Sequence, residues 1–513
     1  MTNDKPRKKC LIAPSPKQLW RVGDFNLRDF GARADGKTNN AAAIQKALDV
    51  CHKAGGGTVY IPPGDYLVGT IDLRANVTLY LEAGATLWGS KNRRDYRRPF
   101  LIYAEDAPNI SIRGRGTIDG NGTSFFLRFG EKQKAKDWRP SRMLRFERCE
   151  NLLLEDITLR NSPAWTVHPV DCERVTIRGI SILNGIYEED GPNTDGINPD
   201  GCSRVRISDC YIQTGDDSIC LKISDGHGGK KVCRDITVTN CVLLSMENAL
   251  KIGTQTCGEF RNITFSNCAI RDAGCGVALR MYDGGLVDGL VVNNISMTLP
   301  HDGVPIFLWS WRRHEDTPWG TVKNVMISNI TATADACIFI SGVREKPIEA
   351  VTLDNIRIFM RGGDREKHHA DPPYPYPVGG HRRAPYDIFC RYVNDLKLRN
   401  IKVTWKKPEK AEWGSVIRCQ GVKDLEISGF EGRQSLGSDA PAVWLKDVKG
   451  AFIHKCRVPQ HTGTFLKLDE GTEAVTLMHN DFRQAEKIAQ VEPSVNPDAL
   501  FETENRPPER KKS

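Results

Sequence analysis

Short strings in which apolar and polar residues alternate recur along most of the chain. Two of them are Arg174–Ile177 (RVTI) and Ile180–Leu183 (ISIL), which are separated by Gly179. Alternation with a period of two predicts strands with one buried face, and the Asn, Asp or Gly between strings predicts a turn. Comparable strings are Asn109–Ile112, Asn151–Leu154, Arg204–Ile207, Asp235–Val238, Asn262–Phe265, Asn324–Ile327, Ala350–Leu353, Asp395–Leu398, Asp424–Ile427 and Ala474–Leu477.

The spacing of these strings predicts a solenoid. Successive strings begin 174 − 151 = 23, 204 − 174 = 30, 235 − 204 = 31 and 262 − 235 = 27 residues apart. Two or three short strands in a repeat of this length are typical of a parallel β-helix. The blades of a β-propeller need about 40–50 residues, so that architecture does not fit. We therefore predict an all-β, single-stranded parallel β-helix, in which each coil packs only on its neighbours.

One helix is expected near the amino terminus. Asn39 or Asn40 can cap it, and Ile44, Leu48 and Cys51 lie on one apolar face. Such a helix would cover the exposed end of the solenoid core. The predicted organisation is a tail over residues 1–24, the β-helix over 25–488 and a polar tail over 489–513. Residues 362–385, rich in Pro, Gly and His, are expected to form a long surface loop.

Composition narrows the partners only slightly. The 513 residues carry a formal net charge of +8, which suits an anionic polymer but also an ordinary surface of mixed sign. The 16 cysteines show no zinc spacing. Cys210, Cys241 and Cys268 end similar phrases (ISDC, VTNC, FSNC) and are expected to stack inside the coils.

The sequence offers no segment for a membrane. No run of 18 apolar residues occurs, and the basic amino terminus lacks the apolar core of a signal peptide. We expect a monomer without nucleic-acid or membrane partners. As it stands the sequence predicts a cytoplasmic location; an extracellular or periplasmic one would require that a signal had been removed.

Three carboxylates form the most informative pattern. Asp195 and Asp216 are 216 − 195 = 21 residues apart, close to one short coil, and Asp217 follows directly. Residues one coil apart stack about 4.8 Å from each other. Asp216 and Asp217 can face one cleft only if the chain bends, and Gly215 permits a bulge. Clustered carboxylates raise at least one pKa, as glycoside cleavage requires of its acid. Asn, Asp and Gly are also turn residues, but three aspartates in this register favour a catalytic site.

At these residues the sequence resembles glycoside hydrolase family 28, the polygalacturonases and their rhamnogalacturonan-cleaving relatives. The phrases that carry the resemblance are FGARADG (30–36), GGGTVYIPPGDY (55–66), NSPAWTVHP (161–169), NTDG (193–196) and GDD (215–217). The resemblance implies the right-handed, pectin-lyase-like form of the solenoid and a pectic poly- or oligosaccharide substrate. It also implies inversion at the anomeric carbon, with Asp216 as general acid and Asp195 and Asp217 holding and deprotonating the water. Neither a metal nor a cofactor is implied.

Two departures from the family pattern concern the neighbouring coils. Aligning LKIGT (250–254) puts Asn248 where the family carries a histidine, and Asn cannot titrate. GVALRM (276–281) leaves Ala278 for the family's arginine and Arg280 for its lysine. Arg280 can still donate two parallel hydrogen bonds to a sugar carboxylate. The loss of a second cation favours a different sugar there, or a divergent exo-acting or rhamnogalacturonan-type enzyme.

Further residues are candidates for substrate binding. His168 lies 195 − 168 = 27 residues before Asp195, and a structural role explains it equally well. Trp309, Trp311 and Arg312 form an aromatic and basic cluster, although core packing explains at least one tryptophan. His368, His369 and His381 could bind a metal, but a solvated surface loop explains them better. The complete set of predicted binding residues is Asn193, His168, Lys222, Asn248, Lys251, Arg280, Tyr282, Arg312 and Tyr386.

Two other functions remain open from the sequence. A polysaccharide lyase of the same fold would use calcium and a basic residue, for which Arg280 is available, to remove the proton α to the carboxyl group. A non-catalytic glycan-binding β-helix is suggested by Asn248. The products would separate these hypotheses, because only a lyase leaves an unsaturated, ultraviolet-absorbing sugar.

Overall fold

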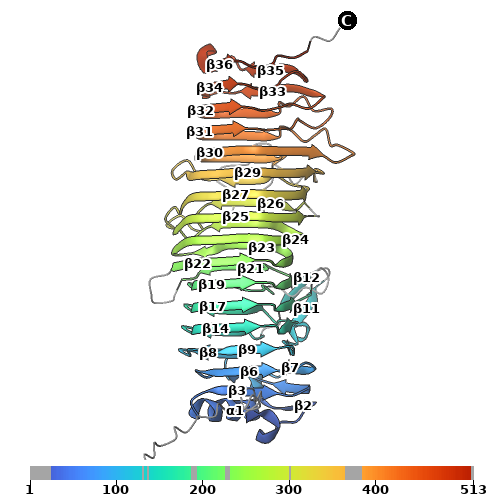
Figure 1. Cartoon of the computed structure of the whole chain (residues 1–513), viewed down its shortest axis with the longest axis vertical. Helices are drawn as coiled ribbons and strands as arrows, with labels where there is room; N and C mark the ends of the chain where they lie inside the picture. The colour runs from blue at the N-terminus through green and yellow to red at the C-terminus, as the bar shows by residue number, and fades with distance from the viewer. Residues whose placement is uncertain are drawn as a thin grey trace, which may run out of the picture.

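The computed structural model describes residues 25–129, 132–135, 138–185, 193–225, 232–299, 302–363 and 384–509. Its strands stack as rungs along one long axis, from the N-terminal end at the bottom of Figure 1 to the C-terminal end at the top. The predicted parallel β-helix is therefore confirmed. The expected tail over residues 1–24 and His368, His369 and His381 lie outside the described residues, as does most of the expected loop over 362–385.

The first half of the solenoid consists of short strands and one α-helix. The helix is α1 (Ala41–Lys53), and short 3-10 helices span Leu27–Phe30, Arg93–Asp95 and Gly122–Phe125. The strands are β1 (Phe25–Asn26), β2 (Asp35–Asn39), β3 (Gly57–Ile61), β4 (Gly64–Val68), β5 (Ile71–Asp72), β6 (Val77–Leu81), β7 (Ala85–Gly89), β8 (Phe100–Glu105), β9 (Ser111–Gly114), β10 (Thr117–Asp119), β11 (Phe126–Phe129), β12 (Lys132–Ala135), β13 (Arg142–Glu147), β14 (Glu150–Glu155), β15 (Thr158–Arg160), β16 (Trp165–Val170), β17 (Glu173–Arg178) and β18 (Ser181–Leu183).

The second half contains longer strands. A short 3-10 helix spans Pro497–Ala499. The strands are β19 (Ser203–Ser208), β20 (Tyr211–Thr214), β21 (Ile219–Ile223), β22 (Val232–Thr239), β23 (Val242–Thr256), β24 (Glu259–Met281), β25 (Leu286–Thr298), β26 (Val304–Ser310), β27 (Thr321–Ala334), β28 (Ile338–Ser341), β29 (Ile348–Met360), β30 (Ile388–Trp405), β31 (Ile417–Ser428), β32 (Val443–His454), β33 (Thr462–Leu468), β34 (Glu473–Met478), β35 (Ala485–Val491) and β36 (Leu500–Thr503).

The predicted strings align in register from coil to coil. Val175 pairs with Val205, Val205 with Ile236, and Ile236 with Ile263, all in parallel. These side chains point inward and are buried in one continuous core. Cys210, Cys241 and Cys268 also lie in this core, so the prediction that they stack inside the coils is confirmed. The in-register stacking fixes which outward residues share a face, and this positions the site below.

Turn residues bend the chain without breaking its hydrogen-bonded ladder. Many of them are Asn or Asp with positive φ, among them Asn262 at φ 53° and Asn267 at φ 53° inside β24. Asn and Asp tolerate this left-handed conformation better than most residues. Strands such as β24, of 23 residues, therefore run around a corner where the alternating pattern predicted separate short strands.

Helix α1 packs on the N-terminal end of the core, and β36 forms the last rung at the other end. Helix α1 begins after Asn40 and buries Ile44, Leu48 and Cys51, as the sequence predicted. At the other end β36 pairs with β34, with Val475 opposite Leu500. The expected polar tail from residue 489 is therefore wrong in its boundary, because the solenoid continues to Thr503. In the described ranges no helix has the length and apolarity needed to cross a membrane.

Candidate active site

The three aspartates meet on consecutive coils. The Asp195 carbonyl accepts from Thr166 N in β16 (2.8 Å), and Gly196 N donates to the Asp217 carbonyl (2.9 Å). One carboxylate oxygen of each of Asp195, Asp216 and Asp217 lies within 4.8 Å of the others. Asp195 and Asp217 are buried, whereas Asp216 is partly exposed. The structure thus brings together the trio that the sequence spacing indicated, with Asp216 facing solvent.

The bend that aligns Asp216 and Asp217 lies between β20 and β21. The Asp216 carbonyl accepts hydrogen bonds from the hydroxyls of Thr214 and Ser245, both at 2.7 Å. Gly215 is not among the described residues with positive φ, so the bend does not use its left-handed freedom as the sequence suggested. Hydroxyl groups from two coils hold the bend instead.

The environments of the three carboxyls push their pKa values apart. Burial raises the pKa of Asp216 well above its ordinary value, and the charges of Asp195 and Asp217 raise it further. Burial also raises the pKa of Asp195, although Lys222 opposes it. Burial alone would raise the pKa of Asp217, but the charges of Lys251 and Lys222, with hydrogen bonds from Lys251 and Asn248, lower it to about 2. One carboxyl therefore keeps its proton while its neighbour is ionised, as an acid/base pair requires.

Two lysines and two asparagines hold the buried carboxylates. Lys251 Nζ lies 2.6 Å from Asp217 Oδ2, and Asn248 Nδ2 donates to Asp217 Oδ1 at 2.5 Å. On the other aspartate, Lys222 Nζ lies 3.7 Å from Asp195 Oδ2, to which Asn198 also donates at 3.2 Å. Three clustered carboxylates can in principle bind a cation. In this structure Lys251 and Asn248 contact both oxygens of Asp217.

Arg280 stands one coil beyond Lys251. Register pairs it with Gly253 in β23 and with Trp309 in β26. Its side chain is only 7% exposed, and its Cζ lies 5.2 Å from the centre of the Phe307 ring. Within the described part of the chain, Arg280 Nε and Nη2 are buried without a hydrogen-bond partner. A desolvated guanidinium of this kind gains from an incoming anion.

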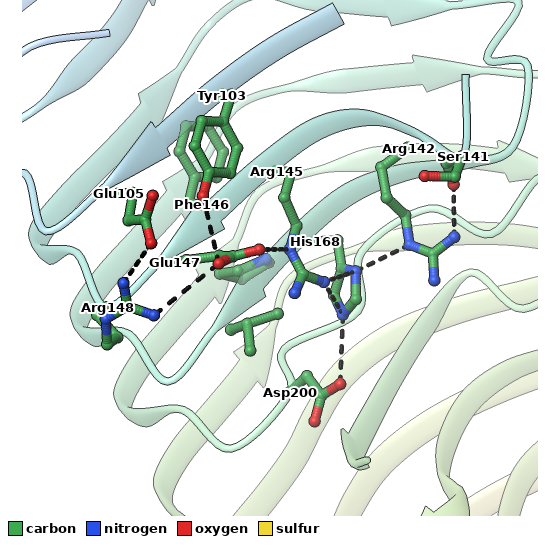
Figure 2. Close-up of polar contacts among 12 residues, drawn as sticks. Tyr103, Glu105, Ser141, Arg142, Arg145, Phe146, Glu147, Arg148, His168 and Asp200 are labelled. Atoms are coloured by element: carbon green, nitrogen blue, oxygen red, sulfur yellow. Dashed lines mark hydrogen bonds and ion pairs between the residues drawn. The ribbon is translucent and has the colours of Figure 1, made fainter. Parts of the chain in front are cut away.

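His168 is buried among charged groups instead of facing solvent. It is 2% exposed, and Figure 2 shows it between Arg145 and Arg142 with Asp200 beneath. Its Nδ1 accepts from Arg142 Nε (2.9 Å) and from Arg145 Nη1 (2.6 Å), because guanidinium groups only donate. Nε2 therefore carries the proton and donates to Asp200 Oδ2 at 3.3 Å. Burial lowers the pKa of His168 to about 3, so the ring is neutral.

Several predicted binding residues lie in an aromatic layer outside the solenoid core. Tyr282 is 2% exposed and packs edge-on against Trp309, and Tyr386 is 3% exposed and stacks on Phe389. Arg312 donates to the Glu315 carbonyl at 2.6 Å in its own loop. The structure therefore gives these residues packing contacts. Asn193, by contrast, is exposed two residues before Asp195 and accepts from Arg139 Nη2 at 3.1 Å.

The sequence reasoning overlooked a group of cations on the preceding coils. Arg139, Arg142 and Arg145 come from the phrase WRPSRMLRF, Trp165 lies within the motif NSPAWTVHP, and Asp200 follows the motif NTDG. Arg142 Cζ lies 3.7 Å from the centre of the Trp165 ring, and Lys222 Nζ lies 4.3 Å from it. The closeness of three arginines to NSPAWTVHP in the repeat was a signal that could have revealed the group.

Comparison with known proteins identifies a family for the chain. Residues 51–373 match the model of the glycosyl hydrolases family 28. A probable polygalacturonase of Vitis vinifera is 30% identical over 306 residues, which are 54% of this chain. The match spans 61% of that relative's length.

Solved structures share the fold. An exopolygalacturonase of Thermotoga maritima superposes with a TM-score of 0.60 at 23% identity, over 74% of this chain and 91% of that one. A family 28 exopolygalacturonase of Yersinia enterocolitica gives 0.56 at 20% identity, over 75% and 78%. At these identities the likeness bears on the β-helix alone.

Proposed function

Because the chain belongs to the glycosyl hydrolases family 28, we propose that it hydrolyses glycosidic bonds in galacturonate-containing polysaccharide or oligosaccharide. One observation carries the proposal: Asp216, partly exposed and with its pKa held well above the ordinary value by burial, stands beside an ionised Asp217. Glycoside cleavage requires such a protonated acid and an ionised carboxylate at one bond. The name of the Vitis vinifera relative supports a polygalacturonate substrate.

In the proposed reaction the proton of Asp216 passes to the glycosidic oxygen as the bond from that oxygen to the anomeric carbon breaks. A water molecule attacks the same carbon and gives one proton to Asp195. Asp195 suits this role because its Oδ1 is buried and accepts no hydrogen bond within the described residues. Asp217 stays ionised. Lys251 and Asn248 donate hydrogen bonds to its oxygens, and its negative charge offsets the positive charge of Lys251.

We propose that water attacks directly and that the configuration inverts. The nearest oxygens of the trio lie within 4.8 Å, closer than the about 6.5–9.5 Å between the carboxyls of most inverting glycosidases. Spacing alone would therefore favour a retaining reaction with a carboxylate nucleophile. However, both oxygens of Asp217 already accept strong hydrogen bonds, which makes Asp217 a poor nucleophile. Asp195 Oδ1 accepts no hydrogen bond within the described residues, so Asp195 is better suited to accept a proton from the attacking water.

A product assay tests the function. The purified protein is incubated with homogalacturonan, rhamnogalacturonan and short pectic oligomers, with and without chelator. Hydrolysis predicts new reducing ends, no product that absorbs in the ultraviolet and no loss of activity with chelator. Unsaturated products that require calcium would establish the lyase instead. The absence of cleavage of every pectic fraction, together with binding, would favour the glycan-binding alternative.

A further inference from the structure

A cavity of about 410 Å³ lies beside the aspartates, on the N-terminal side. Its lining includes Trp138, Arg139, Arg142, Trp165 and Asn193. Register places it: Arg142 pairs with Trp165, and Val167 pairs with Ile197, so Trp165 adjoins Asp195. Arg142 is thus two rungs from Asp195, about 10 Å at the usual rung spacing. This distance exceeds the width of one pyranose ring. The cavity would therefore hold a different sugar unit from the one whose glycosidic oxygen is protonated by Asp216.

The Arg142 guanidinium is fixed on three sides. Nε donates to His168 Nδ1, Nη1 donates to the Ser141 carbonyl at 2.5 Å, and the plane lies over Trp165. Nη2 makes no hydrogen bond to any described residue, and Figure 2 shows it without a dashed line. A guanidinium held in this way is prepared to bind a carboxylate at little cost in side-chain entropy.

The charge around the cavity also suits an anion. Arg139 and Arg142 contribute two cations to the cavity, and none of the described residues that line it is a carboxylate. Burial, together with the charge of Arg145, lowers the pKa of Arg142 to about 10, so its positive charge is poorly solvated. The Asp200–His168 contact fixes the ring that orients Arg142, although neither residue lines the cavity.

We propose that Arg142, supported by Arg139, binds the carboxylate of a uronic acid unit of the substrate on the N-terminal side of the aspartates. His168 and Asp200 are positioning residues that act through Arg142. The inference rests on the proposed function. With Arg280 on the C-terminal side of the trio, the site then has a cation on each side of the cleaved bond. This favours a chain with a uronate in both positions over one in which uronate alternates with a neutral sugar.

Binding to a catalytically inactive protein tests the inference separately from the activity. In an Asp216→Asn background, calorimetry measures the affinity for trigalacturonate and for its methyl ester, with and without Arg142→Gln. A hydrogen bond to a charged group contributes about 1.5–3 kcal/mol, so Arg142→Gln should weaken trigalacturonate binding about 10- to 150-fold. Esterification of every carboxyl should weaken binding more than Arg142→Gln does, because it also removes the carboxylate that Arg280 would bind. The two changes should not add, because both remove the contact with Arg142.

The controls address folding and general charge. Arg148→Gln removes an exposed arginine that pairs with Glu105 and Asp106. Figure 2 shows Arg148 on the opposite side of the view from Arg142. This change should leave both affinities unchanged. Arg142→Lys keeps the charge without the fork and should give an intermediate loss, so it replaces Arg142→Gln if that protein does not fold.

Three results would overturn the inference: equal losses for the acid and the ester, unchanged affinity in both Arg142 variants, or no measurable binding of the free acid. The proposed function can fail independently. A wild-type protein that cleaves no pectic polymer but binds trigalacturonate through Arg142 would disprove hydrolysis and leave this subsite standing.

Discussion

At the residue scale, the contact between Lys251 and Asp217 governs the acid–base balance of the site. The charge of Lys251 lowers the pKa of all three aspartates, against the raising effect of burial. Lys251→Met should therefore raise the pKa of the base Asp195 and of the acid Asp216, and that of Asp217 as well. Both limbs of the pH profile of kcat/KM should move to higher pH, together with a loss of activity.

The profile is measured on polygalacturonate across the acidic and neutral range. Lys402→Met is the matched control, because Lys402 is an exposed lysine paired with Glu431 on the solenoid surface. An unshifted profile in Lys251→Met, or one displaced to lower pH, would show that Lys251 does not set these titrations.

His168 makes the stability of the fold sensitive to acid. Its pKa is about 6.5 when unfolded but about 3 in the fold, because burial disfavours the charged ring and Arg145 and Arg142 face it. A depressed folded pKa stabilises the protein above pH 6.5, and this stabilisation is lost as the pH falls towards 3. Each pH unit in that window removes about 1.4 kcal/mol.

His168→Gln should therefore be less stable than wild type at pH 7 but lose less stability between pH 6.5 and 4.5. Denaturant unfolding at several pH values measures this. The window avoids the titration of Asp200, whose pKa is lowered mainly by the hydrogen bond from His168 against the effect of burial. Parallel pH curves for the two proteins would contradict the assignment of a neutral buried His168.

The aspartate trio was predictable from sequence because residues one coil apart must stack. The role of His168 was not, because its direction depends on side-chain contacts with Arg142 and Arg145 that no repeat spacing encodes. For the same reason the sequence did not show that Tyr282 and Tyr386 are buried. The family pattern places Tyr386 near substrate, and Tyr282 was a candidate because it follows Arg280.

At the scale of the elements, the turns are built from asparagine ladders. Asn109 Nδ2 donates to Asn76 Oδ1 and Asn151 Nδ2 donates to Asn109 Oδ1, both at 2.8 Å. All three residues have positive φ. The sequence showed the recurring Asn but not its conformation, because turn type depends on the backbone on both sides.

Ala350 interrupts such a ladder. It has φ 53° and stands between Asn324 and Asp395 in register. The left-handed conformation costs most residues about 1–2 kcal/mol. Ala350→Asn should remove much of this cost, and the new side chain can donate a hydrogen bond to Asn324. The free energy of unfolding, measured with urea, should therefore rise by about 1 kcal/mol, and the urea midpoint should rise with it. Ala350→Val is the opposing control and should lower it. A lower midpoint for Ala350→Asn would contradict the ladder account.

At the scale of the whole molecule, the cations line one face of the solenoid. Arg142 lies three coils before Lys222, and Lys222, Lys251 and Arg280 lie on successive coils around the aspartates. The chain carries a net charge of +8. Long-range attraction of a polyanion is screened within about 10 Å at 0.1 M salt. We expect kcat/KM on polygalacturonate to fall several-fold between about 0.05 and 0.5 M NaCl. A methyl-esterified polymer should show a weaker dependence, and equal salt dependence would contradict electrostatic attraction.

The β-helix was predictable at this scale because the same pattern of strands and turns recurs in coil after coil. The C-terminal boundary was not predictable, because the apolar residues of 489–503 are scattered among polar residues and two prolines. In the structure Val495 and Ala499 are nevertheless buried in the core, and β36 continues the ladder by pairing with β34.

The most direct test of the account is the rate of Asp216→Asn on polygalacturonate. Asn has nearly the same shape but no proton to give, and a general acid contributes about 10²- to 10⁴-fold. We predict a loss of that size in kcat, with thermal unfolding no lower than that of wild type, because a buried carboxyl is removed from two neighbouring carboxylates. An Asp216→Asn protein that releases reducing ends at the wild-type rate would contradict the assignment of Asp216 as the acid.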